Sequence, residues 1–189
     1  MMKWSDFIKS KGNLFVEVYG SLLNCNERRG VLCAGGLMKT RGEIKRNGIL
    51  SFDKHSVQRC EAVLNFVETG NPTHVYYTKV YEVDKKAFHA IMIREMGLET
   101  TRKFMCGERI KPDDYRPVKM SSEFGETYIF VIQKEGRKLT PTNSEAPYVS
   151  IVRDGICESF SGVEREANLK ALKRAIIESQ IQKCKKLKR

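Results

Sequence analysis

Basic side chains that could bind phosphate are concentrated at the end of this 189-residue sequence, which has a formal net charge of +11. Residues 163–189 hold nine lysines and arginines against three glutamates, and therefore +6 of that charge. Such side chains neutralise phosphates and release counterions, which drives the electrostatic binding of nucleic acid. We therefore predict a nucleic-acid-binding surface made of basic loop, helix and tail residues: Arg41, Lys45, Arg46, Lys170, Lys173, Arg174, Lys183, Lys185, Lys186, Lys188 and Arg189.

The cysteines and histidines do not form a recognisable metal or redox motif. The six cysteines include no Cys-x-x-Cys pair, and the three histidines are not at metal-ligand spacing. Scattered thiols without a secretory signal are typical of reduced cytosolic proteins. No apolar run approaches the roughly 20 residues of a membrane helix. We therefore expect a soluble, cytoplasmic protein with no membrane partner.

Residue patterns in the first half predict alternating strands and helices. Residues 14–19 and 74–83 are rich in β-branched and aromatic residues, as strands are. Residues 43–52 indicate another strand, in which Asn47-Gly48 could also form a hairpin turn. Apolar residues at helical spacing predict a helix over 55–69 and a second over 84–96, which Asp84 caps and Gly97 ends.

The second half has a different pattern. Residues 127–131 and 148–152 read as strands, and Asp154-Gly155 predicts a hairpin turn into a third strand over 156–160. A basic helix then begins at Ser161, where Ser161 and Glu164 fit a capping box.

These elements predict an α+β protein. It has an N-terminal β-β-α-β-α unit over residues 1–108 and a loop or linker over 109–126. Residues 127–189 then form a three-stranded antiparallel meander with one covering basic helix and a basic tail.

The first half resembles the phage- and virus-type branch of the GIY-YIG nucleases. The resemblance covers residues 43–96 and rests on three segments: Val57-Gln58-Arg59-Cys60-Glu61, Thr69-Gly70-Asn71-Pro72 and Asp84-Lys85-Lys86-Ala87-Phe88-His89. It implies a metal-dependent endonuclease in which Tyr19 and Arg59 flank the scissile phosphate. It also implies that Glu95 or Glu99 holds one Mg²⁺ or Mn²⁺ ion. The alternative is that Arg59 is a surface residue and Tyr19 a half-buried strand residue.

Residues 127–180 resemble a double-stranded-RNA-binding domain. The segment 148–155 is similar to the second strand and turn of that fold, and Ala167, Ala171 and Ala175 match the alanines of its closing helix. A generic three-stranded sheet with one packed helix explains the same pattern.

The sequence thus predicts a protein that binds DNA or RNA and that cleaves it if the nuclease resemblance holds. Two non-catalytic alternatives remain open. One is a nucleic-acid-binding or inhibitory adaptor of phage or viral origin. The other is a basic module that binds an acidic protein partner.

Overall fold

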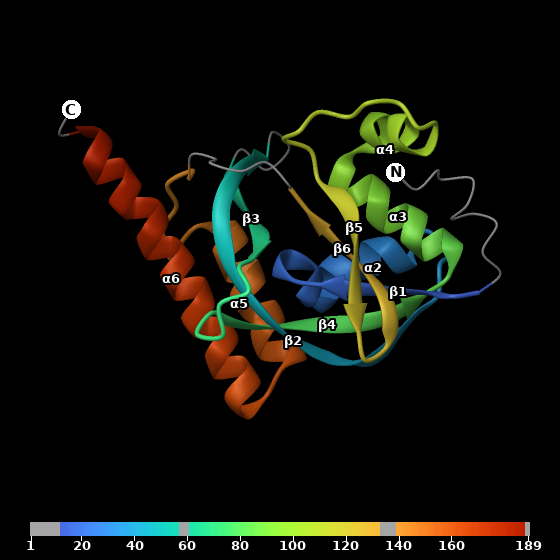
Figure 1. Ribbon diagram of the computed structural model, residues 1–189, viewed down its shortest axis with the longest axis horizontal. Helices are drawn as coiled ribbons and strands as arrows, with labels where there is room; N and C mark the ends of the chain where they lie inside the picture. The colour runs from blue at the N-terminus through green and yellow to red at the C-terminus, as the bar shows by residue number, and fades with distance from the viewer. Residues whose placement is uncertain (1–11, 57–60, 133–138, 188–189) are drawn as a thin grey trace. The chain divides into compact units, whose positions relative to one another are not determined.

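The computed structural model describes residues 12–56, 61–132 and 139–187, with the side chains of these residues except His55 and 182–187. Figure 1 shows the elements coloured along the chain. The strands and helices are β1 (Leu14–Val18), the 3-10 helix η1 (Gly20–Leu23), α2 (Cys25–Leu32), β2 (Met38–Ser56), β3 (Glu61–Glu68), β4 (Val75–Val83), α3 (Lys85–Met96), α4 (Leu98–Met105), β5 (Arg116–Ser122), β6 (Gly125–Val131), α5 (Pro147–Ser159) and α6 (Gly162–Leu187).

The strands form a six-stranded mixed sheet in the order β3-β2-β4-β1-β6-β5. β1 pairs antiparallel with β4 and parallel with β6, and β2 with β3 and β5 with β6 are antiparallel pairs. The predicted α+β class is confirmed. None of the helices in the described part of the chain is long and apolar enough to span a membrane.

The chain divides into two compact units that interleave along the sequence. Unit 1 contains residues 1–18, 28–42 and 79–134, and unit 2 contains residues 19–27, 43–78 and 135–189. Residues 116–122, within the segment assigned to a loop or linker, form strand β5.

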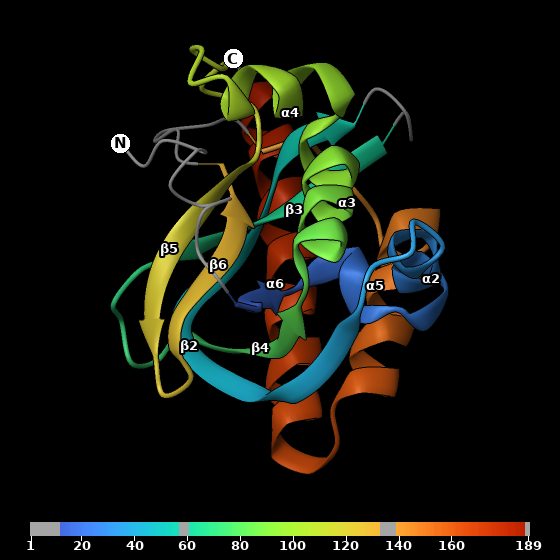
Figure 2. The same ribbon diagram turned by 90° about the vertical axis from the view of Figure 1, so that its right-hand side faces the viewer.

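In unit 1, α3 packs beside β1 and the β5–β6 hairpin, and α4 packs against α3 (Figure 2). The predicted limits of α3 are confirmed: Asp84 Oδ1 accepts a hydrogen bond of 2.7 Å from Ala87 N, and Gly97 ends the helix at φ +82°. The Phe88 ring packs against Tyr128 and Phe130 at centroid distances of 5.7 Å. The strands predicted over 14–19, 74–83 and 127–131 are confirmed as β1, β4 and β6.

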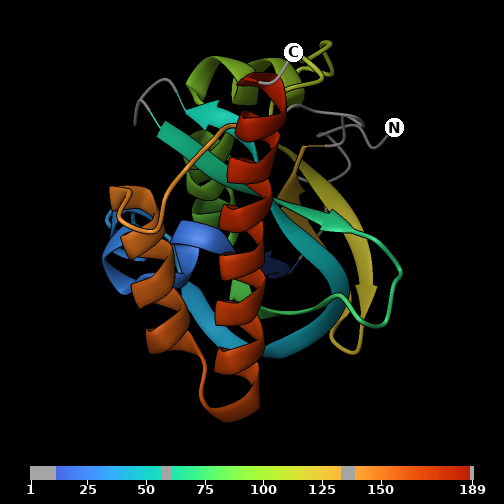
Figure 3. The ribbon, with the colours of Figure 1, turned by 90° about the vertical axis from the view of Figure 1, so that its left-hand side faces the viewer.

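Unit 2 joins β2 from Glu43 onward, β3 and the first part of β4 to η1, α5 and α6. α5 and α6 lie side by side (Figure 3). The fully buried Asn168 on α6 binds the backbone of Tyr77, with hydrogen bonds of 2.8 Å to its N–H and 2.9 Å to its carbonyl. These two bonds fix the position of α6 along β4.

The helix predicted over 55–69 is wrong, because residues 61–68 form strand β3. All five residues from Ala62 to Phe66 are buried, which is the pattern of a strand covered on both faces. Such a short apolar run also satisfies helical spacing, so periodicity could not distinguish the two. Residues 57–60, including Arg59, lie outside the described residues.

Strand β2 continues through Asn47-Gly48, so no hairpin forms there. Gly48 is needed for close packing instead, since a Cβ at this position would collide with the Phe66 ring on β3.

The predicted hairpin over 148–160 is also wrong, and the segment forms helix α5. Its buried residues Tyr148, Val149, Val152 and Ile156 follow helical spacing. Gly155 is an interior helix residue that allows backbone contact, because its Cβ would lie 2.5 Å from Asn24 N and 2.8 Å from Leu23 C. The helix predicted from Ser161 is present as α6 and begins at Gly162.

The finer order of elements is therefore not confirmed. After residue 124 the described chain has one strand, β6, followed by two helices, so the three-stranded meander with one helix is absent from this part. In the first half, α2 lies between β1 and β2, and β2, β3 and β4 follow one another without a described helix between them.

We predict that Gly155→Ala lowers the free energy of unfolding by about 1–3 kcal/mol, because its Cβ would force α5 away from the backbone of Leu23 and Asn24. Gly30→Ala is the matched control. Gly30 also lies inside a helix, α2, but nothing lies within 4 Å of its added Cβ. This control should raise stability by about 0.5–1 kcal/mol. Urea denaturation measures the free energy of unfolding of the parent and of both variants. Equal values for Gly155→Ala and the parent would contradict the close contact at Gly155.

Candidate functional site

The turn that follows β1 brings a glycine backbone and two tyrosine hydroxyls together in unit 2. Gly20 has φ +61°, a left-handed conformation that glycine adopts without strain, and it starts the buried 3-10 helix η1. We call Gly20, Tyr76 and Tyr148 the tyrosine turn.

Tyr148 reaches the turn from α5. Its hydroxyl oxygen would lie 3.1 Å from a Cβ at position 20, so a side chain there would press against it. Leu64 N donates a long hydrogen bond of 3.4 Å to the same oxygen. The Tyr148 backbone is held in turn, because its N–H donates to Glu61 Oε2 at 3.1 Å.

Tyr76 reaches the turn from β4 and is fully buried. Its hydroxyl lies near the Gly20 backbone N–H and near Tyr148 but has no hydrogen bond of ordinary geometry. Burial raises the pKa of Tyr76 well above its usual value, the Gly20 N–H lowers it in part, and Tyr148 raises it further. The hydroxyl therefore keeps its proton and can donate it in a hydrogen bond.

Neighbouring contacts hold the turn in place. Asn24 Oδ1 accepts hydrogen bonds from the backbone of Asn26 and Glu27, at 3.0 and 3.4 Å. Glu158 on α5 accepts a 2.8 Å bond from Cys25 N. Ser159 Oγ, also on α5, donates a 2.9 Å bond to the Leu23 carbonyl.

This arrangement can stabilise negative charge on an oxygen atom. A backbone N–H and neutral tyrosine hydroxyls are donors that favour an oxyanion, and they act most strongly where water is excluded. The sequence analysis missed Gly20, Tyr76 and Tyr148. The available signal was the glycine directly after a predicted strand, whereas Tyr148 was assigned to a strand of its own.

Of the two residues predicted as catalytic, one lies beside this turn. Tyr19 precedes Gly20, is half-buried, and places its ring 6.0 Å from that of Phe66. Arg59 lies outside the described residues.

The two residues predicted to bind metal lie in unit 1 and have basic neighbours. Glu95, with a side chain 18% exposed, pairs with Arg94. Glu99 is exposed and pairs with Arg102 and Lys103, and its hydrogen bond with Arg102 lowers the pKa of its carboxyl. Within residues 12–56, 61–132 and 139–187 there is no group of three histidine, cysteine or acidic residues that could hold a metal ion.

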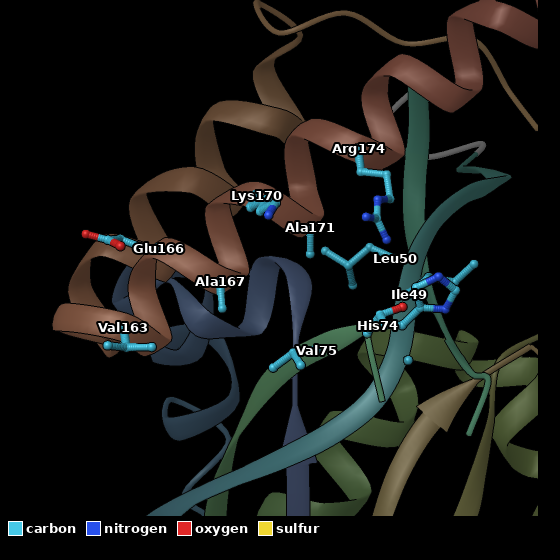
Figure 4. Close-up of a pocket in the computed structure, with 12 residues that line it drawn as sticks. Ile49, Leu50, His74, Val75, Val163, Glu166, Ala167, Lys170, Ala171 and Arg174 are labelled. Atoms are coloured by element: carbon cyan, nitrogen blue, oxygen red, sulfur yellow. The ribbon is translucent and has the colours of Figure 1, made fainter. Parts of the chain in front are cut away.

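The residues predicted to bind nucleic acid have varied surroundings. Arg41, Lys45 and Arg46 belong to strand β2, where Arg41 pairs with Glu82 and Arg46 is only 9% exposed. On α6, Lys170, Lys173 and Arg174 are all exposed, and Lys170 and Arg174 also line a pocket with His74 (Figure 4). For Lys183, Lys185 and Lys186 only the helical backbone is described, and Lys188 and Arg189 lie outside the described residues.

Comparisons with known proteins found the fold but no close relative. No family model matches the chain, and no curated protein matches it. YkqA from Bacillus subtilis is 16% identical over 91% of this chain and 57% of that one, with a TM-score of 0.62. An uncharacterised human protein is 16% identical over 85% of this chain and 88% of that one, with a TM-score of 0.55. A structure titled gamma-glutamyl cyclotransferase is 16% identical over 84% of this chain and 87% of that one, with a TM-score of 0.54.

These similarities overturn both predicted resemblances. The matching structures are neither GIY-YIG nucleases nor double-stranded-RNA-binding domains. The predictions of a nucleic-acid-binding protein, an endonuclease and a viral or phage adaptor are therefore wrong, and the acidic-partner alternative is unsupported. Net positive charge and a helix-like segment over 55–69 misled the interpretation, because that segment contains a strand and several of the basic residues have partners within the protein.

We predict that Tyr76→Phe changes the alkaline stability of the protein. The raised pKa of Tyr76 means that the folded state keeps a proton that the unfolded chain releases near pH 10. Stability of the parent is therefore full below about pH 10 and falls above it, by up to about 1.4 kcal/mol per pH unit for one such group. The free energy of unfolding of Tyr76→Phe should therefore fall less steeply with pH, by that amount. The pKa values of Tyr81 and Tyr128 are also raised, and these two residues contribute the same alkaline loss of stability to the parent and to the variant.

At pH 7 the same variant should be as stable as the parent or slightly more stable, because it removes a buried hydroxyl without a complete hydrogen bond. Urea denaturation midpoints at pH 7 and above about pH 10 give the neutral stability and its alkaline decline. Equal pH slopes for the parent and the variant would show that Tyr76 does not retain its proton.

Proposed function

We propose that this chain is an enzyme that cyclises γ-glutamyl compounds. The observation that carries the proposal is the shared fold with the structure titled gamma-glutamyl cyclotransferase, which extends over 84% of this chain and 87% of that one. The tyrosine turn supports it, because acyl transfer requires donors for a developing oxyanion.

In such a cyclisation the substrate supplies its own nucleophile. The α-amino nitrogen attacks the γ-carbonyl carbon, a new C–N bond closes a five-membered lactam, and the bond to the departing amine breaks. The α-ammonium group must lose a proton and the departing amine must gain one. The products are 5-oxoproline and a free amine, with no net change in oxidation state.

The tyrosine turn would stabilise the tetrahedral intermediate of this reaction. Attack on the carbonyl places negative charge on its oxygen, and the Gly20 N–H with the Tyr76 and Tyr148 hydroxyls can donate to it. Holding these donors in advance avoids reorganisation when the charge develops. Because Tyr76 has no complete hydrogen bond, a substrate oxygen would not have to displace a protein partner from it.

We predict that the protein releases 5-oxoproline from γ-glutamyl dipeptides or γ-glutamylamines and that Tyr148→Phe lowers kcat. Loss of one oxyanion donor typically costs about 10²–10³ in rate, although a neighbouring donor can reduce this effect. The control is Tyr77→Phe, which removes a tyrosine hydroxyl from the same unit but outside the tyrosine turn. Chromatographic quantification of 5-oxoproline measures the rates. No release from any γ-glutamyl substrate would contradict the proposed function.

A further inference from the structure

We infer that a pocket between α6 and the strands of unit 2 binds a small amphipathic carboxylate, at a site separate from the tyrosine turn. The pocket has a volume of about 350 Å³, within the range of small-molecule sites. β2, the start of β4 and α6 line it (Figure 4).

The walls of the pocket are apolar. Ile49 and Leu50 on β2 and Val75 on β4 form one side, and Ala167 and Ala171 on α6 form the other. The two alanines lie one helical turn apart, and their small side chains leave the space that larger residues would fill. Such walls favour an apolar ligand body, because binding removes apolar surface from water.

Two cations and a histidine ring are among the polar groups of the pocket. Lys170 and Arg174 on α6 are exposed and lie one turn apart, and His74 directly precedes β4. Figure 4 shows the Arg174 side chain extending from α6 toward β2 and the His74 ring. Glu166 also lines the pocket, but its carboxylate points away from Arg174 (Figure 4).

Lys170 and Arg174 have few competing partners among the described residues. Within the described chain, neither Lys170 nor Arg174 forms an ion pair or a side-chain hydrogen bond. His74 Nδ1 lies 3.1 Å from Thr69 Oγ1, which orients the ring. An anion could therefore bind to Arg174 and Lys170 without breaking an internal contact of either side chain.

An apolar cavity beside unpaired cations fits one class of ligand, an anionic head group on an apolar body. A simple inorganic anion would leave the apolar walls exposed to water, and a neutral apolar molecule would form no ion pair with Lys170 or Arg174. Of such head groups, a carboxylate matches the planar donor pair of arginine and can accept both of its hydrogen bonds.

The test uses isothermal titration calorimetry on the full chain with three probes: octanoate, octanamide and acetate. Octanoate should bind, and octanamide and acetate should each bind at least about tenfold more weakly, because they lack the charge or the apolar tail. Arg174→Gln and Lys170→Gln should each weaken octanoate binding by about three- to tenfold. Lys173→Gln is the matched control, an exposed lysine on the same helix that does not line the pocket.

A second variant tests the cavity itself. Ala171→Leu keeps every charge but fills the space, so it should reduce octanoate binding at least tenfold while circular dichroism shows a folded protein. Equal binding of octanamide and octanoate, or unchanged affinity in Arg174→Gln or Ala171→Leu, would overturn the inference. Sedimentation experiments test whether the parent forms a dimer. A dimer that is lost in Ala171→Leu would show that a second copy of the chain occupies the pocket, and this result would also overturn the inference. Because binding is read directly, these outcomes are independent of any cyclotransferase activity.

Discussion

Backbone contact between α5 and the turn after β1 is the constraint on which the candidate active site depends. Gly155 permits it, since any side chain there would meet the backbone of Leu23 and Asn24. Tyr148 lies seven residues earlier, close to two helical turns, and so on the same face of α5. A helix held at Gly155 therefore carries the Tyr148 hydroxyl to Gly20, and Glu158 and Ser159 hold the same helix at Cys25 and Leu23.

The elements that the sequence predicted correctly are those with unambiguous local signals. β4 is dense in β-branched and aromatic residues, and α3 has both a capping aspartate and a terminating glycine. The errors fall where one signal fits two structures. Asp154-Gly155 is a turn motif in isolation, yet here the glycine provides space between a helix and a backbone 131 residues away in the chain. Only tertiary packing decides such a case, and for the same reason the convergence of Tyr76 and Tyr148 on Gly20 was not predictable.

Positive charge proved a poor guide to function because many basic groups of this chain have structural roles. Arg41 pairs with Glu82, and Arg28 lies 5.5 Å from the centre of the Tyr81 ring. Arg165 donates hydrogen bonds to the carbonyls of Phe160 and Cys157, at the junction of α5 and α6. Net charge describes solubility and long-range attraction, whereas the use of each cation depends on its neighbours.

Helix α6 shows how one element can serve two purposes through its periodicity. Asn168, Leu172, Ala175 and Ser179 recur at intervals of four, three and four residues, and all are buried. That stripe anchors the helix, through Asn168 to β4 and through Ser179, whose hydroxyl accepts a 3.2 Å bond from Thr142 N. Val163, Ala167, Lys170 and Arg174 recur with the same spacing on the adjacent face and line the pocket. The buried stripe and its hydrogen bonds anchor α6, whereas Lys170 and Arg174 on the adjacent face are exposed. The periodicity of one helix therefore separates the side chains that pack within unit 2 from those that line the pocket.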